Sequence, residues 1–262
     1  MIILLYHQIT NISPDRDPLR LSVSPDLFDR QLRYLSSHGY VCMPLSTAIK
    51  TRLRGDQLPA GAFSITFDDG YQDNYNQALP ILLKYGFTAT VFLVPDQVGK
   101  TTKWWGVNED QGFPLMSWET IRRMAEEGID FGSHSQTHAL LDELDDEQVA
   151  NELRTSKEVI EGKIGKPVEL FAFPYEKSSP RLQGEVERQG YLAACGSLLF
   201  PEDRFNLWRI QLFGTTSMLA FRVMISGLWR RFVEIKYHTR FGVALRRIRK
   251  RHISGYGFQG GG

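Results

Sequence analysis

Residues 63–74 read FSITFDDGYQDN and combine an apolar run with a cluster of polar residues. An apolar run from Phe63 to Phe67 leads directly into two adjacent carboxylates, Asp68 and Asp69, and then a glycine. One interpretation is a plain turn, because Asp-Asp-Gly is favourable turn chemistry. Two neighbouring carboxylates repel each other, however, and become tolerable beside a cation or a shared proton. Since sites in parallel α/β folds form at the carboxyl ends of strands, the alternative is a site at the end of a buried strand.

Short apolar segments with the character of strands recur along the chain, and amphipathic helical patterns lie between them. The helical patterns begin at Ser24, at Ser117 and near residue 145, each with a helix-start signal. Such alternation is typical of a parallel sheet or a barrel. We predict an α/β fold, a single distorted (β/α) barrel of about seven strands. The predicted strands are residues 2–6, 40–43, 62–67, 88–94, 129–132, 170–173 and 192–196.

The charge of the chain is unevenly placed. Over 262 residues the net charge is only +1, and 42% hydrophobic with 23% charged residues is ordinary for a soluble globular protein. Ten of the 31 Lys and Arg residues lie from Ala220 onward, however, against one of the 30 acids, Glu234. An acidic body of net −8 therefore carries a basic end of net +9. We predict one domain over residues 1–216 and a basic, amphipathic, helical tail over residues 217–262.

The tail mixes its cations with Leu, Trp, Phe, Val and Ile, as amphipathic helices at membrane surfaces do. We expect peripheral contact with an anionic membrane through residues 217–252; a tail without any partner is the alternative. Nucleic acid is not expected as a partner, because the body is acidic and no recognition motif is present.

The two cysteines, Cys42 and Cys195, lie in apolar runs without a CxxC spacing, so both are expected to be free thiols. The first residues lack the basic start and long apolar core of a secretory signal. No apolar run approaches the ~18 residues of a spanning helix. We expect a cytoplasmic protein, lying on the inner face of the membrane where the tail binds it.

A second candidate element, IDFGSHSQTHALL over residues 129–141, places His134 and His138 four residues apart after another predicted strand. On a helical turn this spacing directs both imidazoles to one face, where they can bind one metal ion; a chance surface pair is the alternative. An aspartate from the neighbouring strand end would complete a His-His-carboxylate set. Three protein ligands with open positions are typical of hydrolytic metal centres.

Two further segments interrupt the pattern. In LFAFPYEKSS, residues 170–179, Pro174 and Tyr175 turn the chain out of a strand, either as a simple strand end or to aim a backbone N–H at a site. Residues 95–116 form a long irregular segment that contains Trp104 and Trp105, and such loops are usually functional or disordered. Because sugars stack their C–H faces on aromatic rings, this tryptophan pair is a candidate wall of a sugar subsite. Packing beneath the loop is the alternative.

TFDDG, SHSQTH and FAFPY, in this order, resemble the first three motifs of the polysaccharide deacetylase family, carbohydrate esterase family 4, which includes chitooligosaccharide deacetylases. The resemblance covers about residues 1–215. It implies that Asp69, His134 and His138 bind a divalent metal, usually Zn²⁺, with Co²⁺, Ni²⁺ or Mn²⁺ as alternatives. It implies that Asp68 is the general base and that the backbone N–H of Tyr175 stabilises the oxyanion.

The chain departs from this family at two places. Many members have an arginine that steadies the base where this chain has Ala172, so another cation must do so, and Arg209 is the candidate. The late Leu-x-His motif, which supplies the general acid, is absent. His7, in ILLYHQIT, resembles the early Tyr-His of bacterial exopolysaccharide deacetylases with a permuted motif order, and it is the candidate acid. A structural histidine at a strand end is the alternative.

The resemblance implies a metal-dependent N-deacetylase that hydrolyses the acetamide of an N-acetylated sugar, in a saccharide or a glycolipid precursor, and releases acetate. Two alternatives stay open: a hydrolase of the same fold acting on a non-sugar C–N bond, and a catalytically silent metal- or sugar-binding module. The residues expected to contact substrate are Pro174, Tyr175, Trp104, Trp105 and Arg209.

Overall fold

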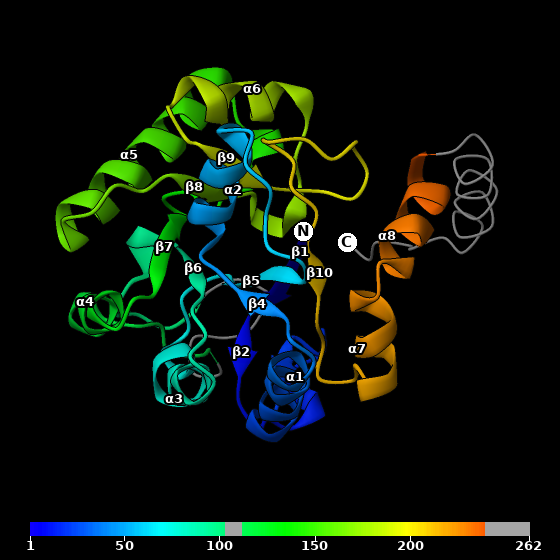
Figure 1. The fold of residues 1–262 in the computed structure, drawn as a ribbon. Coiled ribbons are helices and arrows are strands. Elements are labelled where there is room, and N and C mark those ends of the chain that lie inside the picture. The colour runs from blue at the N-terminus through cyan, green and yellow to red at the C-terminus, as the bar shows by residue number, and fades with distance from the viewer. Residues whose placement is uncertain (103–111, 239–262) are drawn as a thin grey trace, which may run out of the picture.

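The computed structural model describes residues 1–102 and 112–238 of the chain. Its main feature is a curled sheet of parallel strand pairs with helices around it, shown in Figure 1. The strands follow the order β10-β1-β5-β6-β7-β8-β9, and β4 pairs with β5. The predicted distorted (β/α) barrel is therefore confirmed. The strands of this sheet are β1 (Ile2–Tyr6), β4 (Val41–Cys42), β5 (Ala62–Phe67), β6 (Thr90–Leu93), β7 (Asp130–Ser133), β8 (Leu170–Ala172), β9 (Ala193–Cys195) and β10 (Ile210–Gln211).

The three helices with predicted start signals begin where those signals lie. Ser24 and Ser117 cap α1 and α4 by accepting a backbone N–H with their hydroxyl groups, and Asp145 opens α5 in a capping box with Gln148. The α-helices are α1 (Pro25–Ser37), α2 (Leu45–Leu53), α3 (Leu79–Lys84), α4 (Trp118–Glu126), α5 (Asp146–Ile164), α6 (Pro180–Arg188), α7 (Met218–Ile225) and α8 (Leu228–Val233).

β5 lies between β1 and β6, and all of its residues are buried. Phe63 and Phe67 belong to the larger hydrophobic core, which also contains side chains of the surrounding helices. Thr66 donates its hydroxyl hydrogen to the carbonyl of Leu4 on β1 at 2.8 Å. Since helices cover one face of the sheet and the curled sheet encloses the other, both faces of β5 are shielded from solvent.

A smaller core fills the inner face of the curled sheet and includes Ile3, Phe92, Leu170, Ala172, Cys195 and Leu207. The segment after β9 completes its wall. Leu207 donates to the carbonyl of Ala194 on β9 at 2.8 Å, and Ile210 pairs with Leu4 on β1. Arg209 lies between these two attachment points, with its guanidinium carbon 5.7 Å from the ring centroid of Phe92. A large cation is thereby placed inside the barrel.

The sequence predictions miss three of the two-residue strands, although they include a fourth, β4. β2 (Gln8–Ile9) and β3 (Ser22–Val23) form a separate two-stranded sheet, and β10 has two residues as well. Two residues are too few to show a period-two pattern, and β4 was predicted only because it lies in the longer apolar run of residues 40–43. Cys42 and Cys195 are both free thiols, as expected.

The predicted tail begins as helices attached to the barrel. Ser217 caps α7, and Phe221 and Ile225 of this helix belong to the larger core. The ring of Phe221 contacts that of Tyr34 in α1 edge-on, with the centroids 6.3 Å apart. α8 and a π-helical turn, Glu234–His238, follow. Residues 239–252 of the expected membrane segment lie outside the described residues, and no helix in the described part is long and apolar enough to span a membrane.

Candidate active site

The carboxylates of the opening stretch lie at the carboxyl end of β5, and both are buried. The N–H of Asp68 still pairs with the carbonyl of Tyr6 at 3.1 Å, so Asp68 continues the strand. Asp69 then takes φ +72° and Gly70 φ +75°. A β-carbon on Gly70 would lie 2.8 Å from Cδ2 of Leu93, so the turn needs both the conformational freedom and the small volume of glycine. A left-handed aspartate is strained, and such strain is common at functional sites.

His134 and His138 follow β7 on an irregular loop, and the helical turn assumed from their spacing is wrong. Left-handed backbone at Ser135 (φ +63°) and His138 (φ +65°) folds the loop back on itself. The hydroxyl oxygen of Ser135 accepts from the N–H of His138 at 3.0 Å. The carboxylate of Glu152 in α5 accepts from the two N–H groups between these residues. The two imidazoles converge because these hydrogen bonds fix the shape of the loop, and not because the two residues lie on a helical turn.

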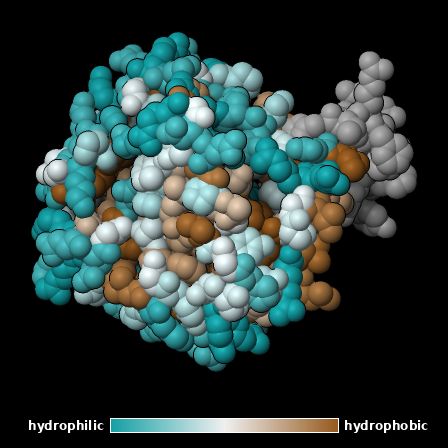
Figure 2. All heavy atoms as spheres, in the orientation of Figure 1, coloured by the Kyte–Doolittle hydropathy of each residue, from teal (hydrophilic) through white to brown (hydrophobic). Residues whose placement is uncertain are grey.

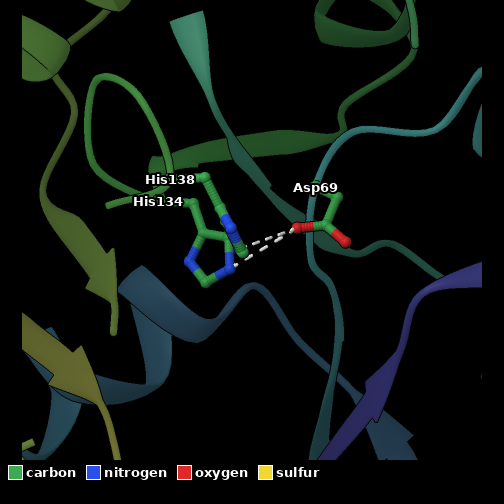
Figure 3. A group of neighbouring side chains, drawn as sticks. All are labelled: Asp69, His134 and His138. Carbon is green, nitrogen blue, oxygen red and sulfur yellow. Dashed lines mark ion pairs between the residues drawn. The ribbon is translucent and has the colours of Figure 1, made fainter. Parts of the chain in front are cut away.

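Asp69, His134 and His138 form a compact, buried group, and Figure 3 shows both imidazoles directed toward the carboxylate. Each residue offers one ligand atom, and these three atoms lie within 4.8 Å of one another. Nε2 of His134 is 3.6 Å, and Nε2 of His138 is 3.4 Å, from Oδ1 of Asp69. The sequence prediction of which side chains come together therefore agrees with the geometry.

The protonation of His134 fits a metal ligand. Its Nδ1 lies 2.7 Å from the carbonyl oxygen of Ala172, which can only accept, so Nδ1 carries the proton. Burial lowers the pKa of His134 and puts the pKa of His138 well below its usual value, which favours neutral rings. The lone pair of Nε2 of His134 then faces a carboxylate oxygen of Asp69. Two electron-pair donors that face each other suit a cation between them, and imidazole with carboxylate is a common Zn²⁺ donor set.

Asp68 is paired with Arg209 in a two-pronged contact. Nη1 donates to Oδ1 and Nη2 donates to Oδ2, each at 2.7 Å. The side chain of Arg209 is 0% exposed, so it faces Asp68 and does not line the pocket where a substrate would lie. Burial raises the pKa of the Asp68 carboxyl, but the charge and hydrogen bonds of Arg209, together with the charges of His134 and His7, outweigh this effect and the pKa falls to about 2. Arg209, on the segment between β9 and β10, therefore provides the cation that this chain does not have at position 172.

His7 stands directly after β1 and lines the same pocket as Asp68. Asn74 donates from Nδ2 to the carbonyl of His7 at 2.8 Å, and the carboxylate of Asp73 accepts from the N–H of Ile9 at 2.9 Å. The second half of the opening stretch therefore fixes the backbone that directly follows His7, a role that the sequence did not predict. Burial lowers the pKa of His7 to about 4, although the charge of Asp68 opposes the shift.

A pocket with a volume of ≈ 290 Å³ lies over these groups. This volume is at the small end for ligand pockets and suits a unit the size of one sugar. An apolar part of its lining, which the sequence analysis did not foresee, comes from the loop before β3 and the segment after β10. The residues that line the pocket are Leu5, His7, Leu19, Leu21, Asp68, Asp69, His134, His138, Tyr175, Glu176, Gln211 and Phe213.

The FAFPY segment brings Tyr175 into the pocket, with its ring centroid 4.6 Å from that of His138. Tyr175 and Glu176 both have left-handed backbone, φ +57° and φ +52°. Burial raises the pKa of Glu176, a further carboxyl in this pocket that the sequence analysis did not select. The only sequence feature that marks Glu176 is its position directly after FAFPY.

Pro174, which was predicted to contact substrate, is buried and does not line the pocket. The predicted subsite at 104–105 lies outside the described residues.

Sequence comparisons point to one family. The polysaccharide deacetylase family model matches residues 55–194. YxkH of Bacillus subtilis (strain 168) is 28% identical over 231 residues, which cover 86% of this chain and 76% of that protein. The poly-β-1,6-N-acetyl-D-glucosamine N-deacetylase of Staphylococcus epidermidis is 28% identical over 191 residues, which cover 66% of this chain and 63% of that protein.

Solved structures share the fold. The Streptococcus pyogenes deacetylase PplD in complex with acetate superimposes with a TM-score of 0.73 at 22% identity, over 86% of this chain and 98% of that one. IcaB from Ammonifex degensii gives a TM-score of 0.69 at 23% identity, over 86% of this chain and 95% of that one. The family match spans more than half of the sequence and contains both TFDDG and the histidine loop, and this chain belongs to the polysaccharide deacetylase family.

Proposed function

We propose that this chain is a metal-dependent N-deacetylase that hydrolyses the acetamide of an N-acetylated sugar and releases acetate. The observation that carries the proposal is the shared pocket: a buried Asp-His-His group lies beside Asp68, a carboxylate held by Arg209. Family membership supports the reaction class, and the named activity of the Staphylococcus epidermidis relative supports an N-acetylated sugar as substrate. Both a saccharide and a glycolipid precursor fit this proposal.

Asp69, His134 and His138 would hold the metal. Their donor set suits Zn²⁺ best, with Co²⁺, Ni²⁺ and Mn²⁺ as alternatives. When bound, such an ion polarises the substrate carbonyl and lowers the pKa of an attached water molecule.

Asp68 would accept the proton of the attacking water. With a pKa of about 2 it is ionised throughout the neutral range. Such a carboxylate is a weak base, so the transfer relies on a water whose own pKa is lowered and on Arg209, which holds Asp68 in one orientation. Tyr175 lines the pocket beside His138, where its backbone N–H is the family-matched donor to the oxyanion.

His7 would donate a proton to the leaving amine. Its ring is neutral before the reaction, so it must gain a proton during turnover before it can give one, and the charge of Asp68 favours that charged form. His7→Gln keeps a similar shape and a hydrogen-bond donor but cannot transfer a proton. We expect kcat to fall about 100-fold in His7→Gln, measured as acetate release.

His38 provides the matched control for that variant, because it is an exposed histidine at the end of α1. His38→Gln should keep the wild-type kcat. If His7→Gln also kept kcat within about 3-fold of wild type, His7 would be a structural residue and another group would supply the proton.

Chelation tests the proposed function as a whole. Acetate release from N-acetylglucosamine oligomers and from a lipid-linked N-acetylglucosamine should stop when a chelator removes the metal and return with added Zn²⁺ or Co²⁺. His138→Ala should reduce both the bound metal and the activity, because it removes one of three ligands. Activity that survives complete metal removal would refute the metal-dependent mechanism. No acetate release from any N-acetylated sugar, with metal bound, would instead favour a silent module or a non-sugar substrate.

A further inference from the structure

The outer face of α7 and α8 is unusually apolar for a surface. Ten large hydrophobic residues are exposed in the described part of the chain, and five of them lie between residues 219 and 235. We define the α7–α8 face by four of these, Leu219, Val223, Leu228 and Phe232, which are 73%, 48%, 60% and 57% exposed. Figure 2 shows brown surface along the edge of the molecule where Figure 1 places α7 and α8.

The α7–α8 face is distinct from the side by which these helices pack on the barrel. Phe221 and Ile225 of α7 and Val233 of α8 are buried. Leu219 and Val223 are four residues apart in α7, and Leu228 and Phe232 are four residues apart in α8. That spacing aligns each pair on one side of its helix. Each helix therefore has one apolar side that meets the core and a second that meets solvent.

Positive charge accompanies the α7–α8 face. Arg222 and Arg231 are exposed on the same two helices, and the guanidinium of Arg222 lies 4.8 Å from the ring centroid of Tyr34. The sequence beyond the described residues, TRFGVALRRIRKRH over 239–252, continues the same mixture of cations and apolar residues. The residues before Ala220 carry a net charge of −8, so attraction to an anionic surface has to come from this end of the chain.

We propose that the α7–α8 face docks on the surface of an anionic lipid bilayer, burying its apolar side chains among the headgroups. Such a surface binds apolar residues interleaved with cations. The apolar side chains enter the boundary between headgroups and hydrocarbon, and the lipid phosphates attract the cations. A nucleic acid fits less well, because the chain carries no recognition motif for one. A protein partner would not need the cations that accompany the apolar side chains. The proposal concerns a different surface from the pocket and does not depend on the activity.

Vesicle sedimentation of the full chain tests this inference. We expect the chain to sediment with vesicles of phosphatidylcholine mixed with phosphatidylglycerol, and much less with phosphatidylcholine alone. Leu228→Ser with Phe232→Ser should lower the partition coefficient about 10-fold or more, because two large apolar side chains no longer enter the interface. Leu219→Ser with Val223→Ser on α7 is a second variant, in case the first is poorly folded.

Leu53→Ser with Leu83→Ser is the matched control, since these leucines are similarly exposed, 51% and 46%, on α2 and α3. It should sediment like wild type, and all three variants should keep the circular dichroism spectrum of wild type. The proposal is overturned if wild type does not sediment with the anionic vesicles, or if both α7–α8 variants sediment as well as wild type. It is also overturned if light scattering shows a dimer that only the α7–α8 variants abolish, without vesicle binding. In that case a second copy of the chain covers this face.

Discussion

Asp68→Asn is expected to lower kcat for acetate release by about 10²- to 10⁴-fold, while the chain still binds its metal. Asparagine keeps the shape of the side chain but cannot accept the proton of the attacking water. Asp69, His134 and His138 are unchanged, so the metal content measured by elemental analysis should equal that of wild type. A combined loss of metal and activity would instead place Asp68 among the metal ligands.

The same substitution removes the countercharge of a buried arginine, so lost activity has to be separated from lost folding. Activity should be expressed per folded chain, with circular dichroism measured under the assay conditions. Asp130→Asn is a suitable control: this aspartate begins β7 and accepts from the hydroxyl of Ser46 at 2.5 Å, away from the pocket. Its kcat should match wild type. An Asp68→Asn variant that retained more than about a tenth of wild-type kcat would exclude Asp68 as the base.

The sequence predicts the parts of this site that are carried by long strands. β5 is long enough to show its apolar character, and the two aspartates mark its carboxyl end. The histidine loop also follows a recognisable strand. Parallel strands bring their carboxyl ends to one edge, so these residues could be expected to meet even though the local geometry was mistaken. The turn at Ser135 depends on a side-chain hydrogen bond and on Glu152, which lies in another element.

The missed parts depend on tertiary contacts without a local signal. Arg209 is not one of them, because the sequence predicted it as the cation beside Asp68, and the two side chains pair although they lie 141 residues apart. Asn74 reaches His7 only once β1 and β5 are paired. Glu176 enters the pocket because its backbone is left-handed. Glutamate seldom adopts this conformation, so its presence in the sequence does not predict one.

Arg209→Met is expected to lower the free energy of unfolding by about 3–5 kcal/mol, because it leaves the carboxylate of Asp68 buried without its partner. Both terminal nitrogens of Arg209 bind that carboxylate, and the exposed fractions of the two side chains are 0% and 4%. Arg204 is the matched control, an arginine of the same segment whose ion pair with Glu187 is solvent-exposed. Arg204→Met should cost less than about 1 kcal/mol. Urea denaturation with a common m-value measures both effects.

The double variant Asp68→Asn with Arg209→Met tells whether the loss comes from the pair or from the lost volume of arginine. If the charge left behind is the cause, removing both charges should recover stability, and the double variant should be more stable than Arg209→Met alone. Its activity should stay as low as that of Asp68→Asn, because the proton acceptor is still missing. Additive losses in the double variant would show that Arg209 stabilises the barrel by filling its interior beside Phe92, and that Asp68 needs no countercharge to remain buried.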